Sequence, residues 1–196
     1  MQNIVESIRR YYPVSDQSIE ELAACFVKKT SPAKELIIEG GKMNNYVYFI
    51  ESGLCRSYCI VDDEEVTSWF SSEGDITFAL LALYRGEPGF EYVETLEPTT
   101  FYCIKIDDLN KLYKTNIEIA NWSRVVHQEC LLSVQTRRIE RLQMAAKERY
   151  EILLKEQPAL FARVKLSYLA SFLGMTPQHL SKMRAEHSNK DIHPIF

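Results

Sequence analysis

The spacing of apolar and polar residues changes along the chain, and each change indicates a different kind of structure. Residues 15–30, SDQSIEELAACFVKKT, begin with residues that cap helices, carry acids in the first turn and end near two lysines. This order suits the helix dipole, which favours acids at the N-terminus and bases at the C-terminus. The pattern predicts that the first 30 residues are helical and that Pro32 ends this region.

Residues 34–106 consist of short β-branched and aromatic runs, such as KELIIEGG, YVYFIESG and LCRSYCIV, separated by turns rich in glycine, acids or proline. Strands of this length and spacing are typical of a small antiparallel barrel or sandwich. The segment ITFALLALYRGEP interrupts them and predicts one short helix-like piece followed by a Gly/Pro loop.

From Asp107 onward the apolar period is helical, and residues 118–139 contain neither glycine nor proline. They predict one helix about 33 Å long. Its apolar residues form two stripes that together cover about 220° of the circumference, which is wider than an ordinary buried face. Such a helix needs two burial partners, the barrel and the same helix of a second copy, or else it is buried entirely within one chain. The stripes are Trp122, Val125, Leu132 and Ile139, and Ile119, Val126, Cys130 and Val134.

The segment MAAKERYEILLKEQ predicts a further helix that Pro158 stops, and the following residues 166–184, LSYLASFLGMTPQHLSKMR, predict two helices around a tight turn. In the first, apolar residues recur at the spacing of one helix face. Gly174 stands where a residue with positive φ ends a helix. Thr176 can cap the second helix and Pro177 suits its first turn.

The second of these helices has two different faces. Leu180 and Met183 are predicted to point inward, while a polar face is made of Gln178, Ser181, Lys182 and Ala185, flanked by His179 and Arg184. A helix-turn-helix places such a face in the major groove, where Gln pairs with adenine edges and Lys with guanine edges or phosphates. Any helical hairpin of a helical domain would show the same spacing, so the pattern alone leaves that alternative open.

The charge distribution favours nucleic acid for the C-terminal part alone. The 196 residues have a net charge of −4, but residues 1–110 hold 9 Lys and Arg against 19 Asp and Glu, a balance of −10. Residues 137–196 hold 11 against 6, a balance of +5. The acidic front repels phosphates and the basic back attracts them. The chain carries no apolar segment that reaches membrane length and no signal core, so a cytoplasmic protein with no membrane partner is predicted.

The residues that carry other chemistry are sparse. The five cysteines are an odd number without a CxxC pair, so they are predicted to be reduced and to act as small core residues, with Cys55 and Cys59 on one side of a strand. All four histidines lie outside the barrel segment, which excludes a histidine-ligated metal site there. Phosphate loops and nucleophile elbows are absent. The sequence therefore does not predict an enzyme, and it predicts no metal site and no cofactor.

Two segments resemble the cyclic-AMP receptor protein / fumarate–nitrate regulator (Crp/Fnr) family of bacterial transcription factors. KELIIEGGKMNNYVYFIESGLCRSY is similar to the first strands of its cyclic-nucleotide-binding-like barrel, and RYEILLKEQPALFARVKLSYLASFLGMTPQHLSKMR to its linker and DNA-binding domain. The resemblance implies an α+β protein with an antiparallel double-stranded β-helix (jelly roll) sensor domain over 1–115, a long dimerisation helix over 116–139, and a helix-turn-helix domain over 140–196.

The same resemblance implies partners and site residues. The partners are double-stranded DNA, a second copy in a homodimer, RNA polymerase and an unknown small-molecule effector. The helix interface would use Trp122, Val125, Val126, Leu132 and Ile139. DNA would be read at Pro177, Gln178 and Lys182, where proline replaces an arginine of the best-known member and so implies a different preferred sequence. The expected DNA-binding set is Thr176, Pro177, Gln178, His179, Ser181, Lys182 and Arg184.

The ligand segment departs from the family pattern. Cyclic-nucleotide binders of this fold carry Gly-Glu-Leu and then Arg-Ser or Arg-Thr, which hold the ribose and the cyclic phosphate. Here the segment reads GDITFALLALYRGEPGFEYVE, with Phe90 and Glu91 at the Arg-Ser positions. An acid there repels phosphate and supplies no bidentate contact. Cyclic AMP is therefore not the expected effector, and the candidate pocket comprises Thr77, Phe78, Arg85, Phe90 and Glu91.

One rival function remains open at this level. A ligand-sensing dimer with the same barrel could act through protein contacts and not bind DNA. Salt distinguishes the two, because DNA affinity falls by about 0.9 log unit per decade of salt for each phosphate neutralised. Arg163 and Lys165 are candidate phosphate contacts on the sequence, with an ordinary surface role as the alternative.

Overall fold

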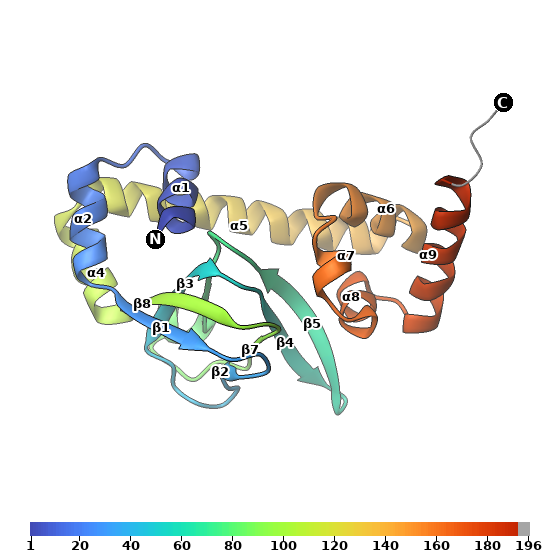
Figure 1. Cartoon of the computed structure of the whole chain (residues 1–196). Helices are drawn as coiled ribbons and strands as arrows, with labels where there is room; N and C mark the ends of the chain where they lie inside the picture. The colour runs from blue at the N-terminus through green and yellow to red at the C-terminus, as the bar shows by residue number, and fades with distance from the viewer. Residues whose placement is uncertain (192–196) are drawn as a thin grey trace. The chain divides into compact units, whose positions relative to one another are not determined.

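The computed structural model describes the backbone of residues 1–191 and the side chains of residues 1–186 (Figure 1). Helices and antiparallel strands both contribute, so the predicted α+β class is confirmed. The chain divides into two compact units, one formed by residues 1–59 and 68–132 and the other by residues 60–67 and 133–196. Of the helices described, none is long and apolar enough to cross a membrane.

The strands of the first region form two four-stranded sheets, ordered β1-β8-β3-β6 and β2-β7-β4-β5. This arrangement confirms the predicted antiparallel barrel. Apolar side chains fill its core, among them Phe49, Ile50, Phe101 and Ile104, each at most 1% exposed. The strands are β1 Val27–Ser31, β2 Leu36–Ile38, β3 Tyr46–Ser52, β4 Cys55–Val61, β5 Glu64–Ser71, β6 Ile76–Phe78, β7 Tyr92–Thr95 and β8 Thr99–Lys105.

The N-terminal prediction was wrong at its C-terminal end. Helix α1 spans Gln2–Tyr11 and α2 spans Asp16–Ala24, with the Ser15 hydroxyl capping α2 as expected. The next residues leave the helix and form β1, whose Val27–Ser31 pair with Thr99–Cys103 of β8. The ladder with β8 satisfies backbone groups and outweighs the local helical pattern, so the lysines of this segment lie on a strand.

Helices also lie between the strands of the barrel and after the last of them. Helix α3, Leu80–Arg85, confirms the predicted interruption of the strands and ends at Gly86, whose φ is 67°. Arg85 is the last residue of this helix. Helix α4, Ile106–Thr115, follows β8 directly and leads into α5, Ile117–Gln143.

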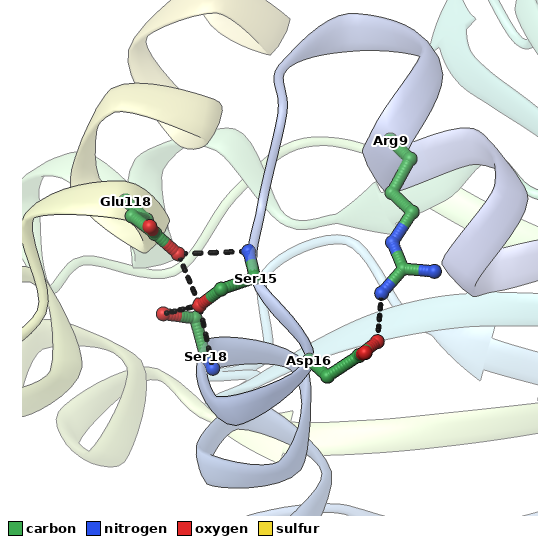
Figure 2. A network of polar contacts seen from close by, with 5 residues as sticks. All are labelled: Arg9, Ser15, Asp16, Ser18 and Glu118. Atoms are coloured by element: carbon green, nitrogen blue, oxygen red, sulfur yellow. Dashed lines mark hydrogen bonds and ion pairs between the residues drawn. The ribbon is translucent and has the colours of Figure 1, made fainter.

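The N-terminus of α5 is joined to the N-terminus of α2 by polar side chains (Figure 2). The Asn116 amide oxygen accepts from the backbone N–H groups of Glu118 and Ile119, so Asn116 caps α5. Its amide nitrogen donates to the Ser18 hydroxyl at 3.0 Å, and Glu118 accepts from Ser15. Two helix starts are thus satisfied by one shared cluster.

Helices make up the C-terminal part. They are the end of α5, then α6 Ala146–Glu156, α7 Leu160–Arg163, α8 Leu166–Leu173 and α9 Pro177–Asp191. Helix α5 extends beyond the predicted 118–139, because residues 140–143 contain no helix breaker. Helix α6 ends before Pro158, as predicted. A small core holds these helices together, formed by Tyr150, Leu153, Leu160, Leu169, Leu173, Leu180 and Met183.

Candidate nucleic-acid interface

Helices α8 and α9 form the predicted pair around Gly174. Gly174 adopts φ 67° and ψ 46°, the left-handed conformation that ends a helix. The Met175 N–H donates to the Ala170 carbonyl at 3.0 Å, and the Gly174 N–H to the Ser171 carbonyl at 3.1 Å. Ala170 is fully buried. The predicted turn is confirmed.

The start of α9 also follows the prediction. The Thr176 hydroxyl accepts from the His179 N–H at 3.2 Å, so Thr176 is the cap, and Pro177 is the first residue of the helix. Leu180 is 0% exposed and Met183 is 6% exposed. These two side chains fix which face of α9 is turned away from the core.

The expected DNA-reading residues at the start of α9 are all exposed. Of these, Gln178, Ser181 and Lys182 lie on the side of the helix opposite the two buried side chains. The whole set runs from the cap of α9 through its first two turns. Arg184 also lies close enough to lower the pKa of Tyr150, whose pKa is nevertheless raised overall, mainly by burial. The exposed residues are Thr176, Pro177, Gln178, His179, Ser181, Lys182 and Arg184. Their role in binding DNA stays a prediction.

The two candidate phosphate contacts lie just before α8. Lys165 precedes the helix and is exposed, with its ammonium 5.3 Å from the centre of the Tyr168 ring. Arg163 ends α7 and is half-buried. Lys165 therefore has an accessible charge next to the helix-turn-helix, while Arg163 is partly covered by neighbouring residues.

Three arginines that the sequence analysis did not single out surround the end of α8. The Arg141 guanidinium donates to the Phe172 carbonyl at 2.6 Å, and Arg149 donates to the Leu173 carbonyl at 3.2 Å. The Arg137 guanidinium lies 4.7 Å from the centre of the Phe172 ring. Arg137 and Arg141 are four residues apart near the end of a long helix, which is where a basic residue suits the helix dipole. Their spacing could have indicated that both side chains lie on one side of the helix, but it did not reveal that both contact Phe172.

The candidate effector residues are dispersed over the barrel and α3. Thr77 is buried in β6, and Phe78 is half-buried beside it. Arg85 is exposed at the end of α3, and Phe90 is 58% exposed. Thr77 and Phe78 are consecutive on β6, so their side chains point to opposite faces of the sheet, and Arg85 and Phe90 are turned toward solvent.

Glu91 behaves differently from these residues. Its Oε2 atom is buried and accepts no hydrogen bond from the described residues. That oxygen would lie 2.2 Å from a Cβ atom on Gly89, so only glycine at position 89 allows the carboxylate to occupy this place. The position expected to differ from the family pattern therefore holds an inward carboxylate oxygen.

A buried arginine of the barrel was missed on the sequence. Arg56 on β4 is 1% exposed, and its Nη1 atom lies 3.0 Å from Oε1 of Glu94 on β7. Its guanidinium also stacks over the Tyr58 ring at 4.4 Å. Arg56 and Glu94 are directly opposite in the register of the two strands. Only strand pairing reveals this contact, because the two residues are 38 positions apart.

Only part of the first predicted apolar stripe of α5 packs against the barrel. Trp122 is 3% exposed and stacks on Phe49 with ring centres 5.8 Å apart, so it belongs to the core of its own chain. Val125 and Val126 are half-buried. Leu132 and Ile139 are 60% and 50% exposed. Three other apolar residues of this part of the helix are exposed as well: Leu131 at 60%, Val134 at 48% and Leu142 at 76%.

His127, also on α5, contacts the segment that carries α3. Its ring packs edge-on against Tyr84 and Phe78, with centres 5.5 and 6.4 Å away, and Ser123 lies 3.3 Å from Nδ1. Burial lowers the pKa of His127. The neutral imidazole therefore suits this aromatic environment, and an uncharged packing role explains the residue.

The cysteines are free thiols, as expected. Burial raises the pKa of Cys55 to about 12 and that of Cys103 to about 11, so both stay protonated. Cys25 and Cys59 are half-buried, but Cys130 is exposed on α5, so the interpretation as a core residue was wrong for Cys130. Within the described residues, no three His, Cys, Asp or Glu side chains gather as metal ligands.

Comparison with known proteins shows which family and which solved structures the chain is similar to. Residues 28–116 match the family described as "Cyclic nucleotide-binding domain". No curated protein sequence is a significant match to the chain. Among solved structures, the chain is similar to FixK2 from Bradyrhizobium japonicum at 19% identity and a TM-score of 0.74, covering 87% of this chain and 88% of that one.

Two further solved structures show the same similarity over nearly the whole chain. One is the c-di-GMP-responsive global regulator CLP of Xanthomonas campestris, at 16% identity and a TM-score of 0.73, with 93% of this chain and 96% of that chain covered. The other is a protein assigned to the Crp/Fnr family of transcriptional regulators, from Eubacterium rectale. It gives 14% identity and a TM-score of 0.70, with 95% and 91% covered.

Proposed function

We propose that the chain is a sequence-specific, DNA-binding transcriptional regulator of the Crp/Fnr type. The match of residues 28–116 to the cyclic nucleotide-binding domain and the similarity of the fold to solved regulators support this proposal. The observation that carries the proposal is the outer face of α9. Gln178, Ser181 and Lys182 are exposed on this face, while Leu180 and Met183 hold the opposite face in the core. A helix fixed on one side and polar on the other suits insertion into the major groove.

The charge of the C-terminal part supports the same proposal. Residues 137–196 carry a balance of +5, within a chain whose total is −4. The local excess of Lys and Arg attracts the phosphate backbone, and contacts such as the one expected from Lys165 position the protein without reading sequence. Gln178 and Lys182 then supply the side chains that distinguish bases.

The protein acts as a homodimer in this proposal. Leu131, Leu132, Val134, Ile139 and Leu142 leave a row of exposed apolar side chains on one helix, and contiguous apolar surface of this kind is typical of an interface. Pairing of two α5 helices would cover it and present two recognition helices to a two-fold symmetric site. RNA polymerase is the further protein partner that the family resemblance implies.

The barrel serves as a sensor for an effector other than cyclic AMP. The family resemblance aligns Glu91 with a residue that holds the cyclic phosphate in nucleotide binders, and here its Oε2 atom is buried, while the buried Arg56 is paired with Glu94. A carboxylate repels phosphate, so a cyclic nucleotide loses an essential contact here. Calorimetric titration with cyclic AMP is expected to show no binding heat.

Selection of bound duplexes from a random pool tests the proposed function. The expected result is an enriched sequence with dyad symmetry and half-sites about one helical turn apart. Affinity for it should fall steeply with salt. Protein that binds no duplex at low ionic strength, or that binds duplexes without any preferred sequence, would contradict the proposal.

A further inference from the structure

The C-terminal end of α8 requires partners for its last four carbonyl groups, because no further helical turn follows. The turn itself supplies two of them. The Ala170 carbonyl accepts from Met175, and the Ser171 carbonyl accepts from Gly174. The carbonyls of Phe172 and Leu173 remain, and these point to groups outside the helix-turn-helix segment.

Two guanidinium groups from other helices complete this end. Arg141, on the last turn of α5, donates from Nη2 to the Phe172 carbonyl at 2.6 Å. Arg149, on α6, donates from Nε to the Leu173 carbonyl and from Nη1 to the Met144 carbonyl, at 3.2 and 2.6 Å. Hydrogen bonds from a charged donor are shorter and stronger than neutral ones, and positive charge is stabilised at a helix C-terminus.

These contacts connect three segments at one point. Arg149 bridges the residue that follows α5 to the last residue of α8, while Arg141 joins α5 directly to the residue before it. Arg137 adds a contact of its guanidinium with the Phe172 ring one helical turn earlier. Gly174 and the recognition helix α9 follow immediately. This cluster therefore connects the end of α5 to the segment that immediately precedes α9.

We propose that Arg141 is a positioning residue for DNA recognition. It fixes the recognition helix to the end of the helix that pairs the two copies, and so sets the spacing of half-sites that the dimer accepts. The inference rests on the proposed function. Arg141 acts through the Phe172 carbonyl and touches neither base nor phosphate, although it is an exposed arginine in a basic domain.

The chain offers a matched control for this role. Arg138 lies on the same turn of α5 and is exposed, and its side chain makes no hydrogen bond or ion pair with any described residue. Arg141→Gln and Arg138→Gln remove the same charge from the same helix, but only the first removes a bond to α8. Arg141→Lys keeps the charge and removes the planar, multiple-donor group.

The experiment measures binding of each variant to the selected palindrome and to versions with one base pair added to or removed from its centre. Wild type and Arg138→Gln should prefer the original spacing to the same extent. Arg141→Gln should lose about tenfold of that preference, on the scale of one hydrogen bond to a charged group. Its salt slope on the palindrome should equal that of Arg138→Gln. Arg141→Lys should lie between the wild type and Arg141→Gln.

Other outcomes would overturn the inference. An unchanged spacing preference with a salt slope smaller by about one would show that Arg141 contacts a phosphate. An equal loss of affinity at every spacing, together with a lower melting temperature, would show a merely structural role. If Arg141→Gln does not fold, an unchanged preference in folded Arg141→Lys counts against the inference. Wild-type protein that binds no duplex would instead refute the proposed function, and the inference with it.

Discussion

Glu118, in the first turn of α5, accepts two hydrogen bonds from Ser15, the cap of α2: one from the backbone N–H at 2.9 Å and one from the hydroxyl at 2.6 Å (Figure 2). The two residues are 103 positions apart in sequence. The hydrogen bonds from Ser15 hold the pKa of Glu118 below its ordinary value. The carboxylate therefore links the start of the long helix to the N-terminal helices.

The first prediction concerns the pH dependence of this link. Because the folded-state pKa of Glu118 is depressed, its contribution to stability is present above the unfolded-state pKa, about 4.3, and is lost as pH falls through the folded value. Glu118→Gln should lower the melting temperature at pH 7. The difference from wild type should shrink between about pH 5 and pH 3, where protonation removes the same charge. Thermal unfolding followed by circular dichroism at each pH measures it.

Glu20→Gln is the control for this prediction. Glu20 lies on α2, is exposed, and makes no hydrogen bond or ion pair with the described residues. Its replacement should leave the melting temperature unchanged across the same range. Equal effects of the two substitutions would mean that the net charge of this region, and not the contact with Ser15, accounts for the result.

Sequence patterns located most elements of this fold but not the contacts between distant ones. The barrel, α3 and the turn at Gly174 follow from turn residues and apolar periods, which are local properties. Residues 27–30 were assigned to a helix because their pairing with β8, at least 70 residues further along the chain, leaves no local sign. The link between Ser15 and Glu118 was missed for the same reason.

The second prediction tests the turn at Gly53, where two constraints coincide. Gly53 has φ 107°, and a Cβ atom there would lie 2.4 Å from Oγ1 of Thr99. Gly41 also has positive φ, 79°, but a Cβ atom would meet nothing within 4 Å. Gly41→Ala should cost about 1–2 kcal/mol from the backbone alone. Gly53→Ala should cost about 2–5 kcal/mol, because crowding adds about 1–3 kcal/mol.

Urea unfolding of the two variants measures this difference directly. The midpoint for Gly53→Ala should fall further than that for Gly41→Ala, with similar denaturant slopes. If the two alanines cost the same, the close approach of Gly53 to Thr99 does not constrain the turn.

The third prediction concerns the exposed apolar residues of α5. Leu131 and Leu142 are 60% and 76% exposed and stand eleven residues apart, which places them on one side of the helix. Replacing both with Asp should shift the protein from dimer to monomer, because two charges would have to be buried in the interface. Sedimentation velocity at micromolar protein measures the change, and affinity for a palindromic duplex should fall with it.

Thr136→Asp serves as the control for that substitution. Thr136 is exposed and lies about 120° around the helix from Leu142, so its charge should leave the dimer intact. A double Leu variant that still sediments as a dimer would assign the interface to another surface. Trp122 is not a suitable test of the same interface, because it packs on Phe49 inside its own chain.

The candidate site was predictable where function depends on local pattern, and not where it depends on tertiary contact. Thr176, Gln178 and Lys182 follow from the capping signal and from the helix period, and the structure leaves all three exposed. Arg141 and Arg149 do not, because the carbonyls that they contact belong to a helix more than 20 residues further along the chain. A backbone carbonyl carries no sequence signal of its own.

The fourth prediction separates base contacts from phosphate contacts in the exposed face. Lys182 is exposed on α9, six residues after the cap Thr176. Lys165 instead precedes α8, and its ammonium lies near the Tyr168 ring. Lys182→Ala should reduce the discrimination between the selected site and single-base variants, by about 1–3 kcal/mol at one position of each half-site. Lys165→Ala should weaken binding to every duplex by a similar factor and reduce the salt slope by about one per subunit.

Competition binding with a panel of single-base variants, repeated at several salt concentrations, measures both effects. Each substitution is the control for the other, because both remove one lysine charge from the same domain. Lys182 is on the exposed side of a helix whose opposite side holds Leu180 and Met183, so its loss should leave the melting temperature unchanged. Full discrimination in Lys182→Ala would mean that this face of α9 does not read the bases, and would move the search for the recognition surface to other residues of the basic domain.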